Sequence, residues 1–184
     1  TFLGHAAYAQ DEPRPDLMLV FDASGSMWGQ VDGVAKIDIA RNVFSDISQN
    51  WAESQQAVGL IAYGHRRKGD CSDIELLQSP SVDAAQSVAT QVQRLVPRGK
   101  TPLSQAVRMA AEELKYTENA ATVVLLTDGK ETCDLDPCAV GAELDRIGVD
   151  FTAHVIGFDI REPADKAQLQ CLAESTGGHY VDAR

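Results

Sequence analysis

Short apolar runs alternate with longer amphipathic segments along most of the chain, and this alternation restricts the fold more than any other feature of the sequence. It is typical of β-strands that are joined by crossover helices. The apolar runs near residues 17–21 and 123–126 are almost continuous, which indicates strands buried on both faces of a parallel sheet. We expect six strands, at residues 17–22, 58–63, 74–77, 122–127, 151–158 and 179–181.

Apolar residues at helical spacing predict helices between these strands. Such stripes run from Ile37 to Trp51 and from Leu103 to Leu114, and the long connection between residues 77 and 122 has room for two helices, at 84–96 and 103–116. Proline at the first helical position marks helix starts at residues 102, 137 and 163. The chain therefore reads as an α/β protein with helices packed on a mostly parallel sheet.

Length and charge exclude several classes of protein. A chain of 184 residues suits one domain, which we place at residues 16–184, with residues 1–15 as a tail or signal-peptide remnant. The 27 acidic and 16 basic residues give a net charge of −11, which argues against a nucleic-acid partner because phosphate binding needs a basic face. No apolar run approaches the roughly 20 residues of a membrane span.

The first residues carry a targeting signal in this interpretation. Ala7 and Ala9 form a small-x-small pattern immediately before a polar run, as at the end of a signal peptide cleaved after Ala9. A linker is the alternative. A signal peptide predicts a periplasmic or secreted protein, and that location would favour disulfides among the four cysteines.

Candidate ligand-binding residues follow the predicted strands. Asp22, Ser24 and Ser26 follow the first strand, Asp128 follows strand 122–127, and Thr101 precedes a helix. The carboxyl ends of parallel strands share one edge of a sheet, where open α/β sheets bind their ligands. Carboxylate and hydroxyl oxygens suit Mg²⁺ or Mn²⁺ better than zinc. Each piece alone is equally compatible with a turn or a helix cap.

Together, and in this order, these five residues resemble the metal-ion-dependent adhesion site of the von Willebrand factor A domain family. The resemblance extends over about residues 16–181. It implies a doubly wound, mostly parallel six-stranded sheet in the order 3-2-1-4-5-6, with one antiparallel edge strand and helices on both faces. The stretches 62–65 and 126–133 look most like bacterial envelope or secreted members of the family.

The resemblance also implies a function. Ser24, Ser26 and Thr101 would coordinate Mg²⁺, or alternatively Mn²⁺ or Ca²⁺, through their hydroxyls, and Asp22 and Asp128 would bind it directly or through water. An Asp or Glu carboxylate of a partner protein would complete the coordination. The implied function is metal-dependent protein–protein interaction without catalysis.

Three further residues are expected to rim this site. Trp28 follows the loop that carries Ser26, while His65 and Arg66 belong to the only basic run, residues 65–68 after the second strand. At the rim, His65 and Arg66 would select an acidic partner. The alternatives are a packed loop aromatic and ordinary solvated charges.

The cysteines allow two pairings. Cys133 and Cys138 are close enough in sequence to bond to each other, but the implied strand order then leaves Cys71 and Cys171 toward opposite sides of the sheet. Pairing Cys71 with Cys133 and Cys138 with Cys171 avoids this difficulty. Both schemes remain open at this point.

Two other functions compete with the binding module. Magnesium sites with carboxylates often serve phosphoryl transfer or hydrolysis, but the sequence has neither a phosphate-binding Gly-x-x-x-x-Gly-Lys loop nor a Gly-x-Ser-x-Gly elbow. Some relatives of the family are cytosolic partner subunits of ATP-driven machines, and reduced cysteines would favour that alternative.

Overall fold

A central six-stranded sheet organises the protein in this computed structural model, which describes residues 14–183. The strand order is β5-β4-β1-β6-β7-β8, and only the β4–β5 pair within this sheet is antiparallel. The strands are β1 (Asp16–Asp22), β4 (Val58–Tyr63), β5 (Ile74–Ser81), β6 (Ala120–Thr127), β7 (Asp150–Phe158) and β8 (Tyr180–Ala183). The predicted α/β class, the order 3-2-1-4-5-6 and the antiparallel edge strand are confirmed.

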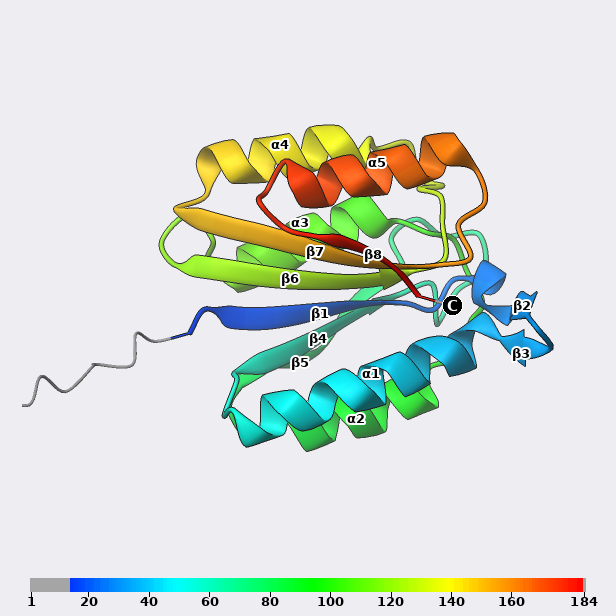
Figure 1. Cartoon of the computed structure of the whole chain (residues 1–184), viewed down its shortest axis with the longest axis horizontal. Helices are drawn as coiled ribbons and strands as arrows, with labels where there is room; N and C mark the ends of the chain where they lie inside the picture. The colour runs from blue at the N-terminus through cyan, green and yellow to red at the C-terminus, as the bar shows by residue number, and fades with distance from the viewer. Residues whose placement is uncertain (1–13, 184) are drawn as a thin grey trace, which may run out of the picture.

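Helices cover both faces of the sheet (Figure 1). They are α1 (Lys36–Glu53) and α2 (Ala85–Arg94) on one face, and α3 (Leu103–Glu113), α4 (Pro137–Ile147) and α5 (Pro163–Glu174) on the other. Strand β1 separates the two cores by its alternation: Leu19 and Phe21 pack toward α1 and α2, whereas Met18 and Val20 pack toward α3. All four side chains are fully buried, as expected for the centre of a parallel sheet.

Most elements differ from the sequence-based expectations by one to three residues at an end, and two features differ more. Strand β5 continues to Ser81 instead of ending at residue 77, because it pairs with β4 through register shifts that let a half-exposed, polar stretch remain in the edge strand. A 3₁₀ helix, η1 (Gly25–Trp28), and a hairpin of β2 (Gln30–Val31) and β3 (Val34–Ala35) precede α1. Positive φ angles at Asp32 and Gly33 form the tight turn of this hairpin.

The N-terminal prediction falls mostly outside the described residues. The proposed signal-peptide cleavage after Ala9 lies within residues 1–13, of which nothing is described. Within residues 14–183, no helix combines the length and the apolar character that crossing a membrane requires.

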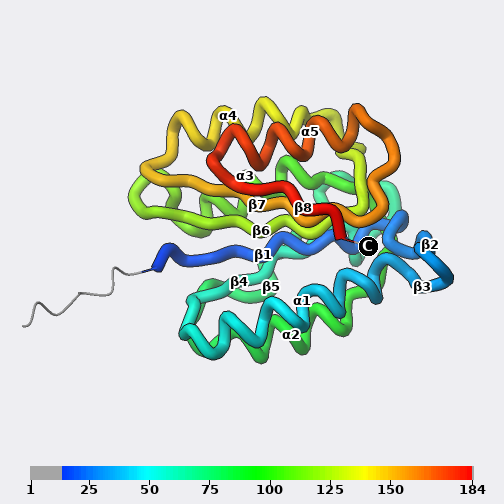
Figure 2. Tube along the Cα trace, viewed as in Figure 1, coloured from blue at the N-terminus to red at the C-terminus, as the bar shows by residue number. Residues whose placement is uncertain are grey.

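The carboxyl ends of β1, β4, β6 and β7 lie at one edge of the sheet. In Figure 2, η1 and the β2–β3 hairpin are at the same end of the molecule. The loops that follow β1, β4 and β6 therefore converge there, together with the segment before α3, which forms a backbone bridge from Gly99 to Ser24. This convergence brings the candidate site residues together.

Candidate metal site at the carboxyl edge of the sheet

The loop after β1 presents a carboxylate and two hydroxyls. Asp22 is fully buried, and its Oδ1 accepts a 2.8 Å hydrogen bond from the backbone N–H of Ser24. The hydroxyl oxygens of Ser24 and Ser26 are 3.0 Å apart. This Asx-type turn arises because a short acidic side chain folds back on the amide two residues later, and it turns both serines to the side of the carboxylate.

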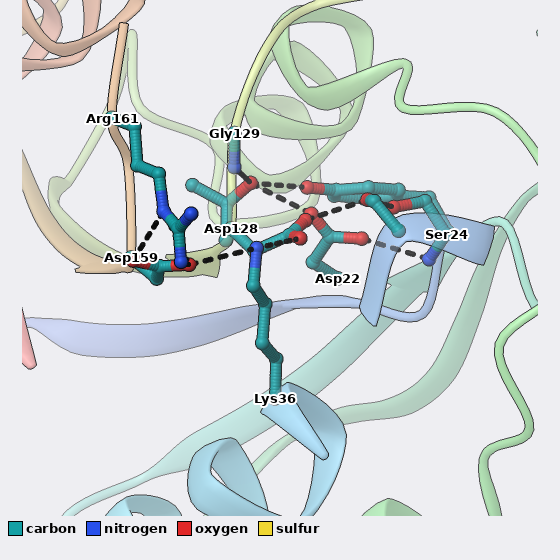
Figure 3. Close-up of polar contacts among 10 residues, drawn as sticks. Asp22, Ser24, Lys36, Asp128, Gly129, Asp159 and Arg161 are labelled. Carbon is teal, nitrogen blue, oxygen red and sulfur yellow. Dashed lines mark hydrogen bonds and ion pairs between the residues drawn. The ribbon is translucent and has the colours of Figure 1, made fainter. Parts of the chain in front are cut away.

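Asp128, at the end of β6, completes this set of oxygens. Its Oδ1 accepts a 2.7 Å hydrogen bond from the hydroxyl of Ser26, and its Oδ2 lies 3.0 Å from the ammonium of Lys36 (Figure 3). The same ammonium is 3.8 Å from Asp159, which is also paired with Arg161. Asp128 therefore connects the loop after β1 to the start of α1 and to the loop after β7.

A buried chain of hydroxyls fixes the second oxygen of Asp22. The hydroxyl of Thr127 donates a 2.7 Å hydrogen bond to Asp22 Oδ2, and the hydroxyl of Tyr63 donates to Thr127 at 3.2 Å. All three residues are fully buried. The orientation of Asp22 is thus set by residues from β4 and β6, not by its own loop alone.

Thr101, the fifth residue of the motif, is held by the loop after Asp128. It is nearly buried, its backbone N–H donates to the hydroxyl of Thr132 at 2.8 Å, and its carbonyl accepts from the N–H of Thr132 at 3.1 Å. Glu131 in the same loop accepts from the N–H groups of Ser104 and Cys133, both at 2.8 Å. The loop after β6 therefore determines where Thr101 lies.

Backbone contacts lock the converging loops against one another. The N–H of Gly25 donates to the carbonyl of Gly99 at 2.9 Å, and the N–H of Gly99 donates to the carbonyl of Gly64 at 2.8 Å. Gly64 has a φ of +69°, and a Cβ there would lie 2.6 Å from the carbonyl oxygen of Lys100. Only glycine permits this close approach without displacement of a neighbouring loop.

The two disulfides settle the pairing that the sequence left open. Cys71 is bonded to Cys133, and Cys138 is bonded to Cys171. The first bond joins the β4–β5 loop to the loop after β6, which is hydrogen-bonded to Thr101 through Thr132. The second bond joins α4 to α5. The alternative pairing of Cys133 with Cys138 is therefore not adopted.

The three predicted rim residues lie in different environments. Trp28 is 54% exposed, and its indole N–H donates to the carbonyl of Pro97 at 2.9 Å. The imidazole Nε2 of His65 is 2.8 Å from Glu75, and the guanidinium of Arg66 is 2.7 Å from the buried carboxylate of Asp73. Trp28 thus faces solvent, whereas His65 and Arg66 are bound to acids next to or within their own loop.

Three residues of this site were not identified from the sequence. Lys36, Tyr63 and Thr127 all contact the candidate donors directly or through one hydroxyl. The position of Thr127 immediately before Asp128 was the only local signal. Contacts between residues far apart in sequence, such as Lys36 with Asp128, leave no such signal in a single chain.

Burial next to a second carboxylate perturbs Asp22. Desolvation, followed by repulsion from Asp128, raises the pKa of Asp22 to about 6, although the hydrogen bonds from Ser24 and Thr127 oppose this shift. An ionised Asp22 is therefore destabilised unless positive charge is added nearby. A divalent cation would supply such charge.

The raised pKa of Asp22 predicts an unusual pH dependence in the presence of EDTA. Because the folded-state pKa lies above that of the unfolded chain, the folded protein binds more protons between pH 4 and 6, and this group loses about 3 kcal/mol of stability as pH rises through that window. Asp22→Asn lacks this loss. Urea unfolding of both proteins is measured at each end of the window. The free energy of unfolding of the variant, relative to that of the wild type, should increase as pH rises; a constant difference would contradict the prediction.

The donor set fits a hard cation better than a soft one. Among residues 14–183, no group of three or more His, Cys, Asp or Glu side chains is arranged to hold a metal ion. The candidate donors are instead two buried carboxylates and the hydroxyls of Ser24, Ser26 and Thr101, all oxygen. Such oxygens match the preference of Mg²⁺, Mn²⁺ and Ca²⁺.

A doubly wound sheet with oxygen donors above the carboxyl ends of its strands defines a class of α/β ligand-binding domains. The von Willebrand factor type A domain matches residues 17–131, and the chain belongs to this family. The uncharacterised protein YwmC of Bacillus subtilis is 30% identical over 177 residues, which cover 91% of this chain and 76% of YwmC.

Solved structures share the fold. The von Willebrand factor domain of the type V pilus tip protein Mfa5 from Porphyromonas gingivalis has a TM-score of 0.66 at 13% identity, covering 91% of this chain and 88% of that one. Proximal thread matrix protein 1 from the mussel byssus, with a zinc-occupied MIDAS motif, has a TM-score of 0.63 at 20% identity over 91% of this chain. The chain spans 41% of the mussel protein.

Proposed function

We propose that this chain is a metal-dependent protein-binding module. A divalent cation, Mg²⁺ in the first instance, would be held by the hydroxyls of Ser24, Ser26 and Thr101 together with Asp22 and Asp128. An Asp or Glu carboxylate of a partner protein would complete the site. The observation that carries this proposal is the hydrogen-bonded set of oxygens from separate loops around two buried carboxylates.

The residues present give the site its chemistry. Two carboxylates would neutralise the charge of a divalent cation. However, the ammonium of Lys36 lies 3.0 Å from Asp128 and already neutralises part of the charge of that carboxylate. When bound, the cation would supply an electrophilic position for an external carboxylate. Ser26 is exposed at the surface, and a cleft of about 470 Å³ opens beside it and Asp128, so the ligand can approach from solvent.

Two observations support an extracytoplasmic location. One disulfide joins two loops beside the site and the other joins α4 to α5, and such bonds persist in oxidising compartments. The Mfa5 domain, which shares the fold, belongs to a pilus tip protein. We propose that this chain acts in the periplasm or outside the cell, in the manner of a bacterial envelope protein. We also propose that residues 16–184 act as one unit.

Thermal unfolding with EDTA and then with Mg²⁺, Mn²⁺ or Ca²⁺ tests the metal site. At 100 times its Kd, an ion that binds only the folded state adds about 2.7 kcal/mol. We expect this gain in the wild type, its loss in Asp22→Ala and Asp22→Asn, and its retention in Asp145→Ala, which changes an exposed acid on α4.

The same measurement is repeated in acetate buffer, because acetate supplies the external carboxylate. A wild type whose stability in EDTA equals that with each ion, with and without acetate, would overturn the proposed function. Equal gains in the wild type and Asp22→Asn would show that the ion binds elsewhere.

A further inference from the structure

One side of the candidate site is positively charged on an otherwise acidic protein. The segments 64–73 and 96–102 contain five basic and two acidic residues, whereas the whole chain has a net charge of −11. Both segments flank the loop that carries Ser24 and Ser26. The local excess of positive charge therefore lies where a ligand of the site would dock.

Within residues 14–183, three of these five basic residues have no acidic partner. Arg66 and Arg67 pair with Asp73 and Asp70, at 2.7 and 3.0 Å. Lys68, Arg98 and Lys100 form no ion pair within the described part of the chain, and all three are exposed. We call Lys68, Arg98 and Lys100 the cationic rim.

Backbone hydrogen bonds hold the rim against the oxygen donors. The N–H of Arg98 donates to the carbonyl of Ala23 at 3.1 Å and also to that of Gly64 at 3.0 Å. Arg98 and Lys100 flank Gly99, which is bonded to Gly25 in the donor loop. A Cβ on Gly99 would lie 2.5 Å from the carbonyl oxygen of Arg67, so the chain just before Lys68 is packed on the same segment.

An exposed aromatic residue adjoins the rim. The hydrogen bond from Trp28 to the carbonyl of Pro97 fixes the indole next to Arg98, yet more than half of the Trp28 surface faces solvent. Val96, in the same segment, is 43% exposed. Tryptophan and arginine that are held in place before binding are the residue types most enriched at the centres of protein interfaces.

We propose that the cationic rim and Trp28 form a docking surface for an acidic protein segment. One carboxylate of that segment would complete the coordination of the cation held at Ser24, Ser26 and Thr101. Further carboxylates would face Lys68, Arg98 and Lys100, and an apolar side chain would cover Trp28. This inference rests on the proposed function and adds the chemical class of its partner. A nucleic acid fits less well, since the remaining surface is strongly acidic and repels an extended polyanion.

Fluorescence anisotropy with synthetic peptides tests this surface. The probe is a labelled peptide with several glutamates and one leucine, titrated in Mg²⁺ or in EDTA. Matched peptides carry a single glutamate, glutamine in place of every glutamate, or alanine in place of leucine. The protein variants are Lys68→Glu, Arg98→Glu, Lys100→Glu and Trp28→Ala, with Arg146→Glu as a control at an exposed position in the last turn of α4.

We expect each reversal of charge in the rim to weaken binding of the acidic probe about fivefold, and Trp28→Ala to weaken it about 30-fold. Arg146→Glu should leave it unchanged, and the rim variants should lose less affinity for the single-glutamate peptide. Equal losses in Arg146→Glu and the rim variants would overturn the inference, as would tight binding of the glutamine peptide.

The stabilisation by Mg²⁺ is measured on each protein in parallel. If the wild type is stabilised by Mg²⁺ but binds no acidic peptide, the docking surface is wrong while the metal site stands. If Mg²⁺, Mn²⁺ and Ca²⁺ all fail to stabilise the wild type, with and without acetate, the proposed function itself fails. Polyphosphate that competes equally well in EDTA would show a general anion-binding surface and would also overturn the inference.

Discussion

Replacing Cys71 and Cys133 together by serine is expected to lower the free energy of unfolding by about 4 kcal/mol. The cysteines are 62 residues apart, and the chain-entropy model assigns a crosslink of that span a stabilisation of this size. The bond also ties the β4–β5 loop to the segment whose Thr132 makes two hydrogen bonds with the backbone of Thr101. We therefore expect the same variant to show a smaller stabilisation by Mg²⁺.

The second disulfide provides a matched control. Cys138 and Cys171 are 33 residues apart and join α4 to α5, away from the candidate donors. Replacing both by serine should cost about 3–4 kcal/mol and leave the stabilisation by Mg²⁺ intact. Urea unfolding with and without Mg²⁺ separates the two effects. Equal metal responses in the two double variants would show that the first disulfide does not support the site.

Gly64→Ala is expected to cost about 3 kcal/mol and to abolish the stabilisation by Mg²⁺. The φ of +69° alone disfavours a side chain by about 1 kcal/mol. In addition, the new Cβ would lie 2.6 Å from the carbonyl oxygen of Lys100 and 2.8 Å from the Cα of Ser24, and displacing packed backbone costs a further 1–3 kcal/mol. The substitution therefore pushes apart the two loops that carry the hydroxyl donors.

Gly69→Ala separates backbone strain from collision. Gly69 lies in the same loop and has a φ of +75°, but a Cβ there would meet nothing within 4 Å. We expect this variant to lose about 1 kcal/mol and to keep its response to Mg²⁺. Chemical denaturation of both variants measures the difference. Similar losses in the two would mean that the contact between the converging loops is looser than the structure indicates.

The sequence predicted the sheet well because its central strands are apolar on both faces. The strand beginning at Val58 has the predicted bounds, and the strand that ends at Thr127 differs only at its start. The edge strand was predicted too short, since Gln78, Ser79 and Pro80 lack the pattern of a buried strand. They continue the strand because its irregular pairing with β4 tolerates them. Asp32 and Gly33 are a strong local signal for the turn of the β2–β3 hairpin.

The site was predicted only as far as local sequence allowed. The order of the motif singled out five candidate donors, which remain a prediction, but not the ammonium that pairs with one of them. Lys36 contacts Asp128 across 92 residues of sequence, and it does so because the hairpin returns the chain so that the N–H of Lys36 bonds to the carbonyl of Gly29. Likewise, the cysteine pairing depended on the distance between loops, which no spacing in the sequence reveals.

The two disulfides also determine how the protein responds to proteolysis. The stretches 72–132 and 139–170 each lie inside a covalent loop, and between Cys71 and Cys171 only residues 134–137 lie outside both. A single cut inside either loop leaves the two fragments covalently joined. A molecule nicked in this way keeps β6 and α3 in the same covalent unit as β1. Its backbone can be cut once at most positions between Cys71 and Cys171 without the release of any fragment.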